Sequence, residues 1–210
     1  MPPRGGDASH ALEMARGLKG HVHAVNVTDG SRAVMRMSSL AVARLLLEEG
    51  IEPVLQMACR DRNRIAIQAD LLGAHALGIR NLLCLTGDPV RAGDQPKARP
   101  VNELESVRLL QQVTSFNRGD DPVKGQLADG PTNIFAGAAA DPQCASWSGL
   151  VRRMQRKKAA GARFIQTQMV MDAGVLERFC REIAEPMQLP VLAGVFLSLI
   201  HISEPTRLGF

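Results

Sequence analysis

The sequence predicts an α/β fold, an incomplete (β/α)8 TIM barrel in which parallel strands alternate with helices. Continuous apolar, β-branched runs recur along the chain, and helix-period segments follow at least the first five of them. The first three runs start 30 and 27 residues apart, and the last three repeat those spacings. A doubly wound dinucleotide-binding sheet would carry Gly-x-Gly-x-x-Gly after its first strand, and the absence of that turn favours the barrel.

Each strand is expected to be parallel to the next one along the chain, because right-handed strand–helix–strand units build such barrels in sequential order. The runs are apolar over most of their length, as strands covered on both faces are. They supply six of the eight strands of a complete barrel. They are expected at 23–28, 53–58, 80–86, 133–138, 163–168 and 190–196.

Capping residues and glycine stops mark the helices between the strands. The segment 151–158, VRRMQRKK, is a basic helical stretch that either forms a solvated surface or faces an anion. The other well-marked helices are 37–49, capped by Ser38 or Ser39 and stopped by Gly50, 61–77, begun by Asp61 and stopped by Gly78, and 103–113, begun after Asn102.

The composition limits the classes of partner. The net charge is +4, but only 3% of residues are aromatic, so the stacking platforms of single-strand nucleic-acid binding are nearly absent and a small anionic ligand is expected instead. The longest apolar stretch, 189–200, is shorter than the ~20 residues that span a bilayer, so no membrane partner is expected. The cysteines lack Cys-x-x-Cys spacing and are interpreted as free thiols of a cytoplasmic protein. They are Cys59, Cys84, Cys144 and Cys180.

Polar residues gather where the predicted strands end, which is the functional rim of a (β/α)8 barrel. Asp88 is the most conspicuous, because Gly87 lets a ligand approach the backbone and Pro89 fixes the exit of the strand. The alternative is that Asp88 only caps a turn. His21 and His23 lie at the opposite end of their strand without a third ligand, so no metal site is expected. The other rim residues are Thr28-Asp29-Gly30, Cys59-Arg60-Asp61, Thr86, Ala140-Asp141-Pro142, Gln168 and Asp172.

Six stretches are long enough to compare with known families. They are PPRGGD (2–7), VNVTDG (25–30), EPVLQMACRDRNR (52–64), DLLGAHALGIRNLLCLTGDP (70–89), KAAGARFIQTQMVMD (158–172) and PVLAGVF (190–196). Together they resemble the methylenetetrahydrofolate reductase family. The resemblance implies a flavoprotein barrel that reduces methylenetetrahydrofolate to methyltetrahydrofolate, in one-carbon metabolism and methionine biosynthesis. FAD would be the cofactor and NADH or NADPH the reductant, with a ferredoxin-linked donor left open.

The resemblance also implies site residues. The family's aspartate after the fourth strand falls on Asp88, which would be catalytic: it would lie near the flavin and accept hydrogen bonds from the N–H groups of the pterin. Gln168 falls on the glutamine that contacts the folate, and Thr28 on the residue that meets the nicotinamide and the flavin. The other implied flavin contacts are Asp29, Gln56 (a place often held by His), Thr86 and Gly87.

Three more positions concern the phosphate and adenosine side of FAD. Arg156 and Lys157 fall on phosphate-facing positions, where they would neutralise the pyrophosphate. The family often has Tyr-Pro-Glu and His-Pro after its fifth strand, whereas residues 136–142 read AGAAADP. Asp141 is therefore the only contact carried over there.

Both ends of the chain are expected to depart from the family. A glutamate that acts as general acid precedes the family's Pro-Pro-Arg, but this chain begins Met1-Pro2-Pro3, so that acid and the first strand are expected to be missing. The resemblance therefore implies that the six strands present are strands two to seven of the family's barrel. Residues 197–210 resemble a translated sequencing adapter, which leaves 1–196 as a partial barrel. By itself such a chain would be inactive and poorly soluble.

Two alternative functions stay open. A barrel homologue could bind flavin or folate, or pass electrons to a partner, without the full reductase chemistry. A flavin-free enzyme acting on a phosphorylated substrate could use the basic segment as its anion site. Besides the folate, the partners considered are a second copy of the chain and an electron-donor subunit.

Overall fold

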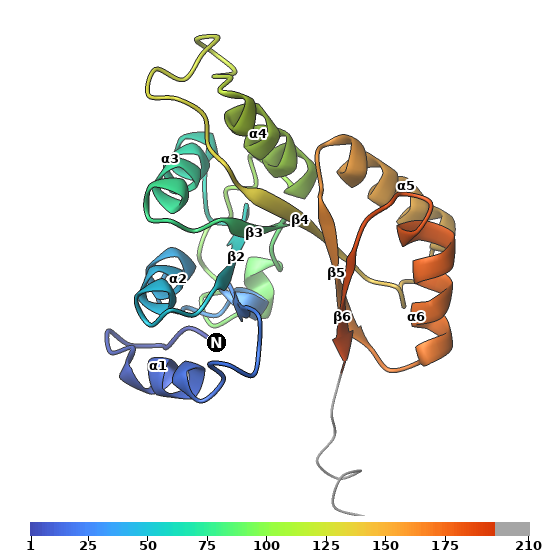
Figure 1. Cartoon of the computed structure of the whole chain (residues 1–210), viewed down its shortest axis with the longest axis horizontal. Coiled ribbons are helices and arrows are strands. Elements are labelled where there is room, and N and C mark those ends of the chain that lie inside the picture. The colour runs from blue at the N-terminus through green and yellow to red at the C-terminus, as the bar shows by residue number, and fades with distance from the viewer. Residues whose placement is uncertain (196–210) are drawn as a thin grey trace, which may run out of the picture.

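The computed structural model describes residues 1–195. Its strands form one curved, six-stranded sheet (Figure 1). Each strand pairs in parallel with the next one along the chain. The predicted order and direction are therefore confirmed. The strands are β1 (Val25–Val27), β2 (Pro53–Ala58), β3 (Asn81–Leu85), β4 (Phe135–Ala140), β5 (Phe164–Val170) and β6 (Val191–Val195). The last residue of the final predicted strand and the tail at 197–210 lie outside the described residues.

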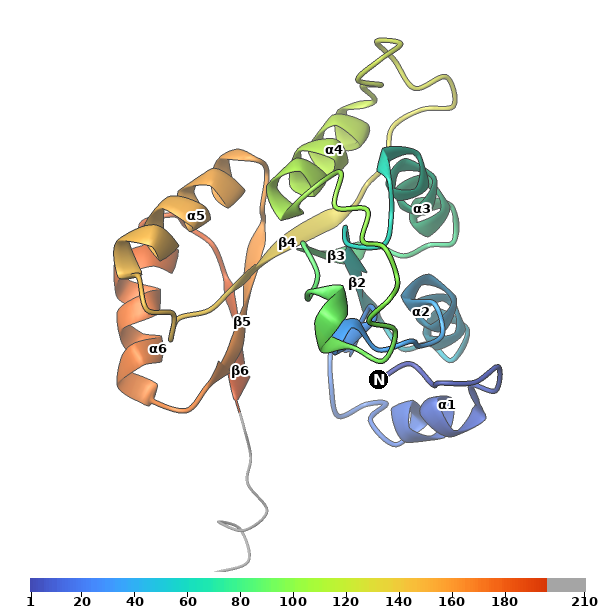
Figure 2. The same cartoon turned by 180° about the vertical axis from the view of Figure 1, so that it is seen from behind.

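The helices lie around the outer side of the curved sheet (Figures 1 and 2). This arrangement confirms the α/β fold and the incomplete barrel. No helix within residues 1–195 has the length and apolar character needed to cross a bilayer. The helices are α1 (Ser9–Arg16), α2 (Ser39–Glu48), α3 (Arg64–Ala76), α4 (Ser106–Arg118), α5 (Trp147–Ala159) and α6 (Ala173–Phe179), with short helical turns η1 (Ser31–Ala33), η2 (Val90–Ala92) and η3 (Cys180–Ala184).

The start of α3 corrects one prediction. Asp61 does not begin the helix, because its carboxylate accepts a hydrogen bond from Arg60 Nε at 2.8 Å instead. Asn63 is the cap, and its side chain accepts the backbone N–H of Ala66 at 2.9 Å. The helix therefore starts three residues later than predicted.

The starts of α2 and α4 add detail to the prediction. Ser38 occupies the N-cap position of α2, as predicted, but its side chain makes no capping hydrogen bond. Ser39 lies inside the helix and donates to the carbonyl oxygen of Gln56 at 3.1 Å. That bond fastens the helix to β2. Helix α4 begins at Ser106 rather than 103, with Glu105 as its cap.

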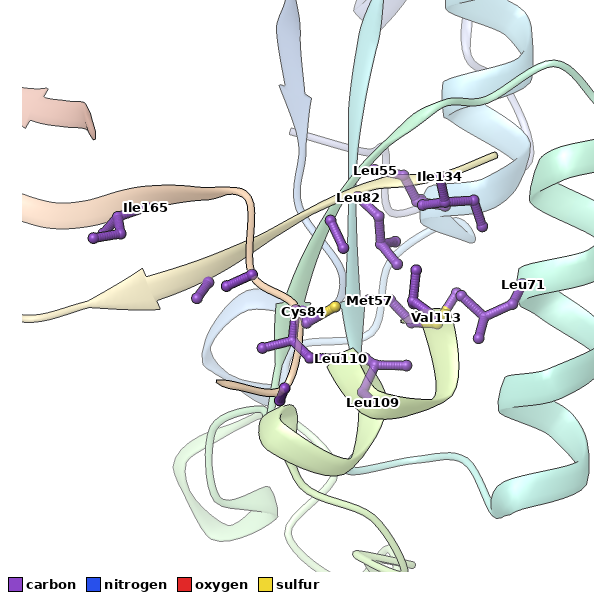
Figure 3. Close-up of a cluster of buried hydrophobic side chains, with 14 of the residues drawn as sticks. Leu55, Met57, Leu71, Leu82, Cys84, Leu109, Leu110, Val113, Ile134 and Ile165 are labelled. Carbon is purple, nitrogen blue, oxygen red and sulfur yellow. The ribbon is translucent and has the colours of Figure 1, made fainter. Parts of the chain in front are cut away.

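The main core lies between the outer face of the sheet and the helices (Figure 3). Cys59 and Cys84 belong to it, and both are fully buried. Burial raises the pKa of the Cys59 thiol to about 12. Both are therefore small core residues, as expected of inert thiols. Figure 3 shows Leu55, Met57, Leu82 and Cys84 of the strands near Leu71 of α3 and Leu109, Leu110 and Val113 of α4.

A smaller apolar cluster covers the inner face of the sheet. Val54, Leu83 and Phe164 are buried there, and the ring of Phe164 stacks on Phe135 with 5.4 Å between the ring centroids. Gly137 lies against this stack, and a Cβ atom at that position would overlap the ring of Phe164. The cluster closes the inner side of the sheet below the strand ends.

Gly137→Ala is expected to lower the free energy of unfolding by about 1–3 kcal/mol, because the added methyl group overpacks the contact with Phe164. Urea denaturation of the full-length protein measures the change. Gly73→Ala in α3 is the matched control: nothing lies within 4 Å of its Cβ position, so the substitution should stabilise the helix by about 0.5–1 kcal/mol. Equal effects of the two substitutions would contradict the role given to Gly137.

Candidate active site

The inner face of the sheet opens at the carboxyl ends of the strands into a cavity of about 370 Å³, here called the rim cavity. Thr28 and Asp88 lie just after β1 and β3, and Gln168 lies in the last part of β5. The structure thus brings together residues that lie up to 140 positions apart in the sequence. The predicted site residues that line the cavity are Thr28, Asp29, Gln56, Thr86, Gly87, Asp88 and Gln168.

Asp88 links two of the loops that follow the strands. Its Oδ2 atom accepts the backbone N–H of Arg32 at 2.6 Å, which links the end of β3 to the segment after β1. The following turn, η2, has no side-chain cap, so Asp88 does not cap it. Gly87 has a φ of +98°, and a Cβ atom there would come within 2.8 Å of Arg60 Cβ. Glycine therefore lets β3 turn above Arg60 and carry Asp88 to the cavity.

Arg60 joins the loops that form the rim of the cavity, a role that the sequence did not reveal. Its side chain is buried, with 5% of the residue exposed. Nη1 donates to the carbonyl oxygens of Gly30 and Asp88, both at 3.3 Å. The backbone oxygen of Arg60 accepts the N–H of Val101 at 2.8 Å. Arg60, which itself follows β2, thus contacts the segments that follow β1 and β3.

Asp29 reaches the rim cavity, but protein groups already bind its carboxylate. Oδ2 accepts the backbone N–H of Ala58 at 2.8 Å and Arg62 Nη1 at 2.6 Å. Arg62 in turn donates from Nε to Asp70 at 2.8 Å. Asp29 and Arg62 are largely buried, with side chains 11% and 18% exposed. The pair fastens β1 to β2 and α3.

Three predicted site residues do not line the rim cavity. Lys157 lies beside it and donates to the carbonyl oxygen of Ala139 at 2.6 Å, and burial lowers the pKa of its ammonium group. Arg156 points elsewhere and forms an ion pair with Glu105 at 3.4 Å. Asp141 accepts the backbone N–H of Gln143 at 3.0 Å, a local turn contact.

A second cavity of about 510 Å³ adjoins the first. The two cavities share Thr86, Gly87 and Asp88, and the second extends to Glu105 at the start of α4. Thr86 Oγ1 accepts the backbone N–H of Ser106 at 3.2 Å, so the start of α4 lies next to the shared residues, and Arg156 reaches this region through its ion pair with Glu105. The shared residues make the two cavities adjoining parts of one site.

An irregularity in β5 turns three consecutive residues toward the rim cavity. The pairing of β5 with β6 shifts register between Gln166 and Met169, and Gln166, Thr167 and Gln168 all line the cavity. Thr167 Oγ1 accepts the backbone N–H of Gly194 at 2.9 Å. Such bulges commonly redirect side chains next to active sites. Gln166 was not among the predicted site residues, although its place two positions before Gln168 puts it on the same face of the strand.

Comparisons of solved structures show the fold. The chain is similar to 2,3-dimethylmalate lyase, a member of the PEP mutase/isocitrate lyase superfamily, with a TM-score of 0.51, 11% identity, and coverage of 93% of this chain and 82% of that one. It is also similar to a putative lyase/mutase from Burkholderia cenocepacia J2315, with a TM-score of 0.53, 14% identity, and coverage of 94% and 70%. At such identities the likeness concerns the fold alone.

Sequence comparison identifies the family. A probable methylenetetrahydrofolate reductase (NADPH) from Caenorhabditis elegans is 26% identical over 162 residues, which are 75% of this chain and 22% of that protein. The chain thus spans about a fifth of the length of this curated relative. The family model described as methylenetetrahydrofolate reductase matches residues 1–202, nearly the whole chain. The chain belongs to the methylenetetrahydrofolate reductase family.

Proposed function

We propose that the full-length protein reduces methylenetetrahydrofolate to methyltetrahydrofolate, with FAD as cofactor and NADH or NADPH as reductant. Membership of the family supports folate reduction. The name of the curated relative supports a nicotinamide reductant. The observation that carries the proposal is the rim cavity, where the carboxylate of Asp88 and the amide of Gln168 reach one space from different strands.

The chemistry of these groups suits a pterin ring. Asp88 accepts hydrogen bonds, which the amino and ring N–H groups of a pterin donate. Gln168 offers both a donor and an acceptor, and its exposed side chain can meet a ring that enters from the open side of the cavity. Thr28 adds a hydroxyl group from the opposite part of the rim. These residues orient the substrate and keep a negative charge next to it.

The residues present also fit a flavin. When bound, FAD would supply the centre that takes a hydride from the nicotinamide and gives it to the folate. Gly87 brings the backbone before Asp88 to the cavity, because its missing Cβ atom leaves room for Arg60 and Ala58. The side-chain oxygen of Gln166 is buried in the cavity wall without a hydrogen-bond donor from residues 1–195, as an acceptor for a ring N–H would be. Lys157 and Arg156 would hold the phosphates, and Arg156 would then have to exchange Glu105 for them.

The test uses the full-length protein. Bound flavin is expected from the absorbance of the purified protein, and steady-state rates with a nicotinamide and methylenetetrahydrofolate should follow ping-pong kinetics, because the two substrates use one site in turn. Comparing NADH with NADPH identifies the reductant. Flavin or folate binding without turnover would favour a binding or electron-transfer homologue, and binding of neither would contradict the proposal.

A further inference from the structure

Gln166 has an unusual environment for a polar side chain. It lies on β5, paired in register with Ala139 of β4 and Leu192 of β6, so its neighbours across the sheet are apolar. Its Oε1 atom is buried, and no donor within residues 1–195 reaches it. A buried amide oxygen without a partner is unfavourable, and an apolar side chain would suit this position better for folding alone. The protein thus keeps a costly amide in the wall of the rim cavity.

A second buried amide shows why the place of Gln166 matters. Gln112 of α4 also has a buried, unpaired atom, Nε2, but its Oε1 accepts a hydrogen bond from Gln68 of α3 at 3.3 Å. Gln112 lies between helices, away from the strand ends. Gln166 makes no such contact with another side chain in the described chain, and it lines the rim cavity next to Gln168.

We propose that Gln166 is an additional ligand-binding residue of the rim cavity. Its carboxamide carries a donor and an acceptor side by side, which complements a ring edge that presents an N–H group next to a C=O group. The pyrimidine parts of flavin and pterin rings both have such an edge. The inference rests on the proposed function for the identity of the ring.

The bulge in β5 separates the tasks of the two glutamines. Gln166 is half-buried and Gln168 is exposed, so Gln166 lies deeper in the cavity. Thr167 holds the bulge through its bond to the N–H of Gly194, and a Cβ atom on Gly194 would come within 2.9 Å of the Gln168 carbonyl oxygen. A ring bound by Gln166 would therefore lie on the inner side of the cavity, and Gln168 would be left for a second ring nearer its opening. This order assigns the flavin edge to Gln166 and the folate to Gln168.

The test compares Gln166→Leu with Gln112→Leu in the full-length protein. Titration of the flavin-free protein with FAD gives one dissociation constant, and titration of the flavin-loaded protein with tetrahydrofolate gives the other. Gln166→Leu is expected to weaken FAD binding about tenfold, the loss of one to two hydrogen bonds. Its urea midpoint without ligand should equal or exceed that of the wild type, because an unpaired buried amide is removed. Gln112→Leu should leave both dissociation constants unchanged.

The outcomes separate the two rings and the two proposals. Weaker FAD binding supports the flavin edge, and weaker tetrahydrofolate binding alone supports the same pairing with the pterin edge. Unchanged dissociation constants for Gln166→Leu, or a lower urea midpoint without ligand, would overturn the inference, since Gln166 would then be a structural residue. A wild-type protein that binds neither ligand is a different result, because it contradicts the proposed function and the inference falls with it.

Discussion

Replacing Asp88 by asparagine is expected to slow hydride transfer to methylenetetrahydrofolate by at least about tenfold, while reduction of the flavin by the nicotinamide stays near the wild-type rate. Asparagine keeps the size of the side chain and one acceptor atom but loses the charge. Its amide group also presents donors where the pterin presents donors. A hydrogen bond to a charged group contributes about 1.5–3 kcal/mol, and each 1.4 kcal/mol corresponds to a factor of about ten.

The charge of Asp88 has a second expected effect. A carboxylate close to a flavin disfavours added electron density, so its removal should raise the reduction potential and make the reduced flavin a poorer hydride donor. Rapid-mixing measurements of the two half-reactions, together with the potential, separate this effect from weaker folate binding. No loss in the folate half-reaction would refute the role of Asp88.

Asp94 offers a matched control, because it makes the same kind of loop contact. Its Oδ1 atom accepts the backbone N–H of Met35 at 2.9 Å, and Asp88 accepts that of Arg32 at 2.6 Å, so both fasten the segment between β1 and α2. Among the described residues that line the rim cavity, Asp94 is absent. Asp94→Asn should leave both half-reactions unchanged. If it reproduced the losses of Asp88→Asn, the effect would come from the loop contact.

The position of β2 was predictable from its sequence. Both faces of this strand are buried over nearly its whole length, so its apolar run lies at the predicted residues. β4 starts two residues later than predicted, for a reason that no local pattern carries. The side-chain oxygen of Asn117 in α4 accepts the hydroxyl of Thr132 at 2.7 Å and the backbone N–H of Ile134 at 2.9 Å. The N–H of Ile134 therefore bonds to a side chain instead of a neighbouring strand, and β4 begins after it.

The site residues that could be predicted are those that lie at or near the carboxyl ends of the strands. Thr28, Asp88 and Gln168 line the rim cavity because parallel strands end on the same side. The partners of the charged residues were not predictable. Asp29 pairs with Arg62, 33 positions away, and Arg156 with Glu105, 51 positions away. Such pairs depend on how loops of neighbouring units fold over one another, which spacing within one unit does not encode.

Replacing Arg62 by methionine is expected to lower the free energy of unfolding by about 3–5 kcal/mol, the usual cost of leaving one charge of a buried pair without its partner. Methionine preserves most of the packing volume, so the lost guanidinium group is the main change. Asp29 would keep only the N–H of Ala58, at 2.8 Å, and Asp70 would lose its contact at 2.8 Å. Urea denaturation of the full-length protein measures the loss.

Two further substitutions decide whether burial of the Asp29–Arg62 pair causes the loss. Arg64→Met removes a pair with Glu103 whose side chains are 53% and 40% exposed, and exposed pairs contribute only about 0–1 kcal/mol. Adding Asp29→Asn to Arg62→Met should recover part of the stability, because a neutral amide tolerates burial beside Ala58 better than an unpaired carboxylate. If Arg64→Met were as costly as Arg62→Met, or if Asp29→Asn recovered nothing, the cost would come from side-chain packing and not from the unpaired charge of Asp29.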